Sequence, residues 1–125
     1  FSERLISLLS QKFAPYGFCY ELLPFQTVSD QLSDWLTARE KNSLVLLIDE
    51  YDAPLTSCLN NKTVFKEVRR ALSAFYSVLK SNEGALRFAF ITGITKFNRT
   101  SIFSELNNLS DLSLDVEYGN LLGYT

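Results

Sequence analysis

The feature that most constrains this chain is a short apolar run that ends directly in carboxylates. Leu44–Ile48 reads Leu-Val-Leu-Leu-Ile and is followed at once by Asp49 and Glu50. The run is too short to cross a membrane and too uniformly apolar for a strand with one solvent-exposed face. It therefore predicts a strand of a parallel sheet that is buried on both faces. Open α/β sheets bind ligands at the carboxyl ends of their strands. Carboxylates beside a buried strand cost free energy unless a cation or ligand shares the site, so this strand end is the candidate site.

The residues before this strand predict a helical lead-in over residues 1–43. Apolar residues at helical spacing predict a helix over 1–13, which Pro15 and Gly17 end. Residues 18–23 fit either a short strand or an extended link. A second helix is expected to begin after Thr27, with Asp30 in its first turn and the basic residues Arg39 and Lys41 at its end.

The residues that follow Asp49 and Glu50 predict a parallel crossover. A loop over 54–62 leads to a long amphipathic helix that opens near Thr63 and closes at Asn82-Glu83-Gly84. A second apolar strand is expected over 86–92. Because a strand, a helix and a strand in this order form a parallel unit, Asp49 and Thr92 are expected at the same sheet edge.

The last third of the chain carries weaker signals. Residues 94–100 read as a polar loop, Ser101 is expected to cap a short helix that ends near Asn107, residues 111–115 alternate like an edge strand, and 118–124 read as a connecting loop. The expected fold class is therefore α/β with a mostly parallel sheet, in a single domain over 1–125.

Composition excludes several classes of function. The 125 residues carry a net charge of −2 and a pI near 5.1, which argues against a general nucleic-acid coat or a binder of anionic membranes, although a local basic patch leaves nucleic acid open. There is no histidine, which excludes histidine zinc sites, Ser-His-Asp triads and Cys-His nucleophiles. Cys19 and Cys58 are expected to be reduced thiols. With no membrane-spanning run or secretory signal, a cytoplasmic location is predicted.

A buried strand ending in Asp-Glu is the Walker B arrangement of P-loop NTPases. In that arrangement the aspartate, here Asp49, holds Mg²⁺, and the glutamate, here Glu50, orients the water that attacks the γ-phosphate. Thr92 is the expected phosphate sensor, with Thr95 or Lys96 as the alternative. None of the five glycines is followed by lysine, so the chain has no Walker A phosphate loop and is not expected to hydrolyse ATP alone.

An ordered set of sequence blocks resembles the AAA-ATPase-like family of bacterial proteins. The blocks are LVLLIDEYDAPL (44–55), FYSVLK (75–80), FITGITKF (90–97), SIFSELNNL (101–109) and LGYT (122–125). The resemblance implies a partial P-loop NTPase-type three-layer sandwich that lacks its first strand and Walker A loop. It also implies ATP and Mg²⁺ as ligands of the intact protein, with Asp49 on the metal side, Glu50 as the catalytic carboxylate and Thr92 as the sensor.

The same resemblance implies partners within a longer protein. Family members typically carry a Walker A segment before this region, and many carry a PD-(D/E)XK nuclease-like domain after it. The absence of methionine also suggests that Phe1 is not a native start. A sheet without its first strand is expected to self-associate through an exposed edge.

Two other functions remain open on the sequence. One is a non-hydrolysing interaction module on the same fold. The other is a metal-dependent nuclease that uses Asp49, Glu50 and Asp52, with Lys96 as the nearby lysine. Otherwise Asp52 is expected to be a turn residue and Tyr51 a wall of the pocket or core. Arg99 is better explained as a solvated loop cation than as an arginine finger.

Overall fold

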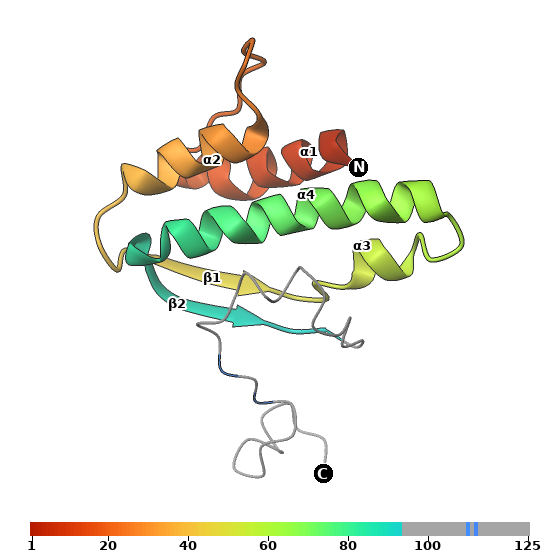
Figure 1. Ribbon diagram of the computed structural model, residues 1–125. Coiled ribbons are helices and arrows are strands. Elements are labelled where there is room, and N and C mark those ends of the chain that lie inside the picture. Colours follow the sequence, from red (N-terminus) through yellow and green to blue (C-terminus); the bar gives the residue numbers. More distant parts are fainter. Residues whose placement is uncertain (94–109, 111, 113–125) are drawn as a thin grey trace.

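A computed structural model describes residues 1–93, 110 and 112 of the chain. In chain order its elements are α1 (Ser2–Phe13), the 3₁₀ turn η1 (Ala14–Tyr16), α2 (Val28–Thr37), β1 (Leu44–Ile48), α3 (Ala53–Thr56), α4 (Lys62–Ser81), the 3₁₀ turn η2 (Glu83–Ala85) and β2 (Leu86–Ile91). Figure 1 shows α4 running along the two strands, with α1 and α2 on the other side of α4 from the strands. The expected loop, helix and edge strand over 94–124 lie outside the described residues, except for Ser110 and Leu112, which are in neither a helix nor a strand.

The two strands pair in parallel, as the crossover pattern predicted. Leu44 pairs with Leu86, and after a register irregularity the ladder continues from Val45 with Phe88 to Ile48 with Ile91. Parallel strands need a long connection, and here α4 supplies most of it. The described part of the chain is therefore α/β, and both predicted strands are confirmed.

The core lies on both sides of α4, toward the sheet and toward α1 and α2 (Figure 1). Its buried apolar members are Leu9, Phe18, Leu32, Leu36, Tyr51, Leu55, Val68, Leu72, Phe75, Tyr76, Leu79 and Ala85. Five of these are on α4 at helical spacing, so one stripe of this helix is buried. The β1 side chains that face this core are Leu44, Leu46 and Ile48.

The expectation that β1 is buried on both faces is wrong for the structure as described. Val45 is 58% exposed and Leu47 is 68% exposed, and their neighbour Phe88 on β2 is 55% exposed. These three residues define what we call the open sheet face. The sequence pattern of an all-apolar strand cannot show which of its two faces receives a helix, because both faces read alike.

The lead-in packs through an aromatic cluster. Phe13 of α1 stacks on Trp35 of α2 with ring centroids 5.5 Å apart, and the Phe18 ring meets Trp35 edge-on. The guanidinium of Arg39 lies 5.0 Å from the centroid of the Trp35 ring and donates to the carbonyl of Tyr16. Arg39 therefore binds this cluster beyond the end of α2, which closes at Thr37, earlier than the charges predicted.

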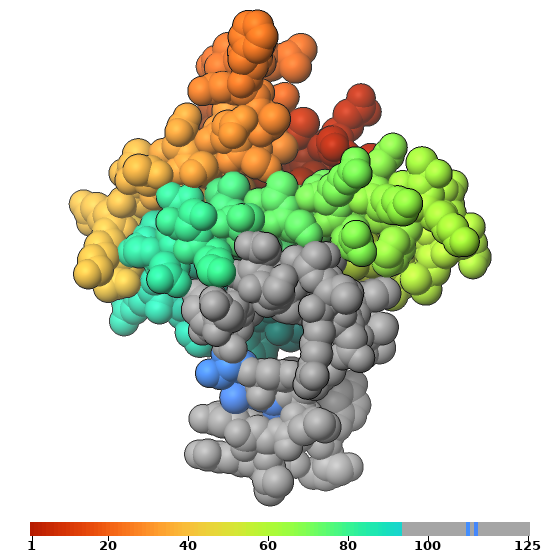
Figure 2. Space-filling view, viewed as in Figure 1, coloured from red at the N-terminus to blue at the C-terminus, as the bar shows by residue number. Residues whose placement is uncertain are grey.

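Residues 18–23 form no strand, and the segment between α1 and α2 projects from the body of the molecule (Figure 2). The side chain of Gln31 holds its base, because it donates to the carbonyl of Glu21 and accepts from the Glu21 amide. At the tip, Leu22 and Phe25 are almost fully exposed. Among the described residues, no helix has the length and apolar character that a membrane crossing needs.

Part of the segment 54–62, expected as a loop, is helical: α3 covers Ala53–Thr56, and its Thr56 amide donates to the Asp52 carbonyl. The long helix α4 begins at Lys62, close to the predicted Thr63, and the side chain of Asn61 caps it by accepting from the Val64 amide. Asparagine is among the preferred capping residues.

The open sheet face predicts that the 125-residue chain self-associates at high concentration, because an apolar patch of this kind is removed from water by association. Leu47→Asp is expected to shift light scattering toward the monomer. Leu59→Asp, at a leucine that is 56% exposed outside the sheet, is the matched control and is expected to leave the association unchanged. A monomeric wild-type chain, or equal effects of the two substitutions, would contradict this prediction.

The hydrogen bonds at the start of α2 are expected to make the stability of the fold depend on pH. Asp30 accepts hydrogen bonds from the amide and the hydroxyl of Thr27, and these lower the pKa of Asp30 from its ordinary 3.8. Their contribution is present above that value and is lost as the pH falls through the folded-state pKa. Asp30→Asn is expected to lower the urea midpoint at neutral pH, with the deficit shrinking in acid; Asp34→Asn on the same helix is the control. An equal deficit at both pH values would refute this.

Candidate functional site

The carboxyl ends of β1 and β2 bring Asp49, Glu50 and Thr92 together. The Thr92 amide donates to the Ile48 carbonyl at 2.8 Å, which extends the ladder one residue past β2. The Thr92 hydroxyl donates to Oδ1 of Asp49 and accepts from the Glu50 amide at 3.2 Å. We call these three residues the acidic strand end. The crossover pattern predicted that Asp49 and Thr92 lie at the same sheet edge, and they do.

Glu50 lies at a sharp turn between β1 and α3. Its φ of 52° places it in the left-handed region, which residues with side chains rarely adopt. Its carbonyl accepts from the Ala53 amide at 3.0 Å, and the next residue, Tyr51, donates from its amide to the Thr92 carbonyl at 2.9 Å. The backbone of Glu50 is therefore held on both sides. Strained backbone of this kind is enriched at functional sites.

Both carboxylates of the acidic strand end are exposed to solvent. The expectation that they pay a desolvation cost beside a buried strand is therefore wrong for the described structure. The case for a cation here rests on the donor groups that meet at the strand end and not on burial.

A buried polar group lies directly behind the strand end. Tyr51 and Asp52 are buried; Asp52 lies in a turn, as predicted, but is only 2% exposed. Burial raises the pKa of the Tyr76 phenol well above its usual value, and its neighbours Tyr51 and Asp52 raise it further. Tyr51 belongs to the core, one of the two places predicted for it. Asp52 is buried whereas Asp49 and Glu50 are exposed, and among the described residues no three such side chains are placed to hold a metal together.

Gly93 is the residue that the sequence analysis missed. A Cβ added at Gly93 would overlap the ring of Tyr51 and lie 3.0 Å from Oδ1 of Asp52. The signal in the sequence is a glycine directly after the strand residue that reaches the acidic strand end. Its partner, 42 positions earlier, could not be identified from that signal, because the contact depends on how the two strand ends pack.

The residues present fit a magnesium ion that is shared with a substrate better than a protein-only metal site. Within residues 1–93, 110 and 112, no group of three or more Asp, Glu, Cys or His side chains is placed to hold a metal. Mg²⁺ commonly takes one or two carboxylates and fills its other positions with water and phosphate oxygens. Asp49 can provide such a carboxylate. The predicted Thr95, Lys96 and Arg99 lie outside the described residues.

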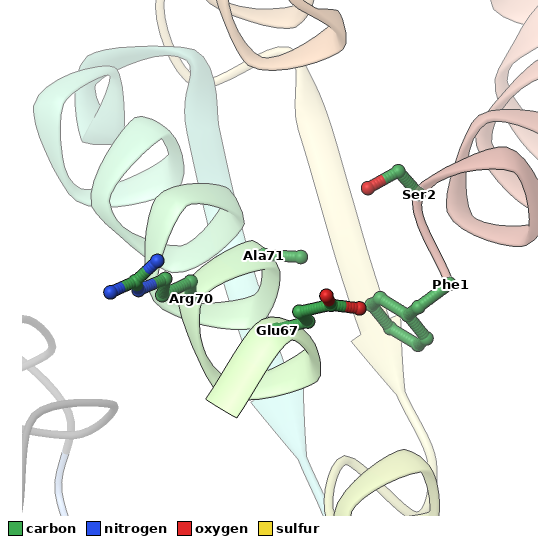
Figure 3. Close-up of a pocket in the computed structure, with 5 residues that line it drawn as sticks. All are labelled: Phe1, Ser2, Glu67, Arg70 and Ala71. Carbon is green, nitrogen blue, oxygen red and sulfur yellow. The ribbon is translucent and has the colours of Figure 1, made fainter. Parts of the chain in front are cut away.

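A shallow hollow of about 360 Å³ lies elsewhere on the molecule. Phe1, Ser2, Glu67, Arg70 and Ala71 line it, at the start of α1 and along α4. Figure 3 shows Glu67 pointing toward the Phe1 ring and Arg70 extending away from it. No residue of the acidic strand end borders this hollow, so it is not part of the candidate site.

Comparisons with known proteins agree with the resemblance of the sequence blocks. The family described as "Predicted AAA-ATPase" matches residues 1–103, which includes the helical lead-in, so the chain belongs to this AAA-ATPase-like family. It is also 44% identical over 82 residues to an uncharacterized protein in the vnfD 5′ region of Azotobacter chroococcum mcd 1. That match covers 66% of this chain and 16% of the relative's length. No solved structure gives a significant match.

The bonds of Thr92 predict a specific stability loss. Thr92→Val keeps the shape but removes the hydroxyl that serves Asp49 and Glu50, so we expect the free energy of unfolding to fall by about 1–3 kcal/mol in urea denaturation. Thr92→Ser retains the hydroxyl and is the control, with a smaller loss expected. Equal losses for the two variants would show that the hydroxyl does not tie the strand ends together.

Proposed function

We propose that the acidic strand end is the metal-binding and water-activating half of an ATP hydrolysis site. The observation that carries the proposal is the hydroxyl of Thr92, which contacts the Asp49 carboxylate and the Glu50 amide where two parallel strands end. Membership of a family described as a predicted ATPase supports the choice of nucleotide. Open α/β sheets also place ligands at this end of their strands.

Each residue has a distinct role in this proposal. Asp49 would hold Mg²⁺, directly or through water, and the bound ion would supply positive charge against the phosphate oxygens. Glu50 would accept a hydrogen bond from the attacking water and orient it, for which its exposed carboxylate is accessible. Thr92, which already bonds to Asp49, would sense the γ-phosphate, with Thr95 or Lys96 as the alternative sensor.

The phosphate loop in this proposal comes from sequence outside these 125 residues. The chain matches only 16% of the Azotobacter relative, which leaves most of that protein's length beyond the match. We propose the P-loop three-layer sandwich as the fold of the complete domain, with a Walker A segment before this region and a further domain after it. The open sheet face supports that architecture, because parallel sheets are normally covered by helices on both faces.

An interaction module that does not hydrolyse nucleotide is the second candidate. The observation in its favour is the projecting segment between α1 and α2, where Phe25 is fully exposed at a φ of 67°. Exposed apolar side chains on an anchored loop are typical of protein contacts. This candidate predicts a complete protein that binds partners without turning over ATP. By contrast, the burial of Asp52 disfavours the nuclease that would use it with Asp49 and Glu50.

Magnesium-dependent ATP turnover by the complete protein tests the proposal. Glu50→Gln keeps the size of the side chain but removes the water-orienting carboxylate, so we expect turnover to fall by about 100-fold or more while ATP binding persists. Glu40→Gln makes the same chemical change at an exposed position before β1 and is expected to leave turnover unchanged. Turnover is measured by phosphate release, and binding by equilibrium titration with a fluorescent ATP analogue.

The other outcomes have clear meanings. A complete protein that neither binds nor hydrolyses ATP would refute the hydrolysis site and favour the interaction module. If the protein hydrolyses ATP and Glu50→Gln retains full turnover, Glu50 does not orient the attacking water. Removing Mg²⁺ with a chelator is expected to stop turnover in the wild type.

A further inference from the structure

The contact between Tyr51 and Gly93, two residues that flank the candidate site, leaves no room for a side chain at Gly93. The Tyr51 ring lies so near the Gly93 backbone that even one methyl group at Gly93 would overlap two of its ring carbons. The ring is also only 8% exposed and belongs to the core. Because protein interiors are closely packed, it has little room to move aside.

Tyr51 and Gly93 are each the next residue after a member of the acidic strand end. Tyr51 follows Glu50, and Gly93 follows Thr92. The Tyr51 amide donates to the Thr92 carbonyl at 2.9 Å, so a backbone hydrogen bond joins the two strand ends in addition to the ring contact. A shift of the Tyr51 ring would therefore also move the backbone of the neighbouring residues Glu50 and Thr92.

The conformation of Glu50 depends on the same packing. A φ of 52° is unfavourable for a glutamate and persists only where neighbouring contacts hold it. Before Glu50 in the sequence lies β1, which is paired with β2, and directly after it comes Tyr51, whose ring is buried. The ring anchors the chain after the turn and so determines the direction in which Glu50 leaves the sheet.

We propose that Gly93 and Tyr51 are positioning residues that set the geometry of Glu50 and Thr92 for the ATP hydrolysis site. This inference rests on the proposed function. Gly93 acts by having no side chain, which lets the Tyr51 ring settle against the end of β2. Tyr51 acts through its ring, which occupies the space that a side chain at Gly93 would need.

Gly84 provides a matched control within the same chain. A Cβ added at Gly84 meets no atom within 4 Å, so Gly84→Ala makes the same substitution in open space. Tyr51→Phe is the corresponding control for the ring, since it retains the contact with Gly93. Gly84→Ala is expected to keep wild-type turnover, and Tyr51→Phe is expected to lose less kcat than Tyr51→Ala.

The experiment compares ATP turnover by the complete protein with the variants Gly93→Ala, Tyr51→Ala and the two combined. We expect each single variant to lower kcat by about 100-fold, as small misplacements of reacting groups do, with KM for ATP changed less than about threefold. The double variant is expected to be no worse than Tyr51→Ala alone, because without the ring there is nothing for the new methyl group to displace. Circular dichroism identifies a temperature at which every variant is folded.

The results separate the two proposals. If wild type turns over ATP and Glu50→Gln does not, but Gly93→Ala keeps its kcat, the positioning role is wrong and the hydrolysis site stands. Multiplying losses in the double variant would also refute the positioning role. If wild type has no turnover, both proposals fail. Should Gly93→Ala not fold, the kcat and KM of Tyr51→Ala, compared with Tyr51→Phe, decide the question.

Discussion

The parallel pairing of β1 with β2 is the constraint on which the rest of the structure depends. It brings residues 42 and 43 positions apart within hydrogen-bonding distance, which no local interaction could do. Two strands alone have little stability in water and need a packed helix. Here α4 both connects the strands and covers one of their faces. The site therefore exists only when the crossover is folded.

The lead-in supports α4 from the side opposite the sheet. Asn82, at the end of α4, donates to the Ser33 hydroxyl and accepts from that of Thr37, which joins this helix end to α2. The stacking of Phe13 on Trp35 then joins α1 to α2. Each layer thus depends on its neighbour, and the position of the acidic strand end depends indirectly on the lead-in. This agrees with a family match that begins at residue 1.

Exposed and buried residues follow one another directly after β1. Asp49 and Glu50 are exposed to solvent, which leaves them accessible to the proposed nucleotide and metal, while Tyr51 is buried in the core. The left-handed backbone conformation of Glu50 makes this change from exposed to buried possible within three residues. An accessible carboxylate on a rigid base is what orientation of a water molecule requires.

The sequence by itself determined the two strands, the long helices and the placement of Asp49 and Thr92 at one edge of the sheet. Helical periodicity located α1 and α4, and apolar runs located both strands, because these signals depend on neighbouring residues. Asp49 and Thr92 were placed together because a parallel crossover leaves few alternatives. Only the tertiary structure decided that one face of β1 is open, that Asp52 is buried and that Tyr51 meets Gly93. These features depend on packing between distant segments, which composition and spacing do not encode locally.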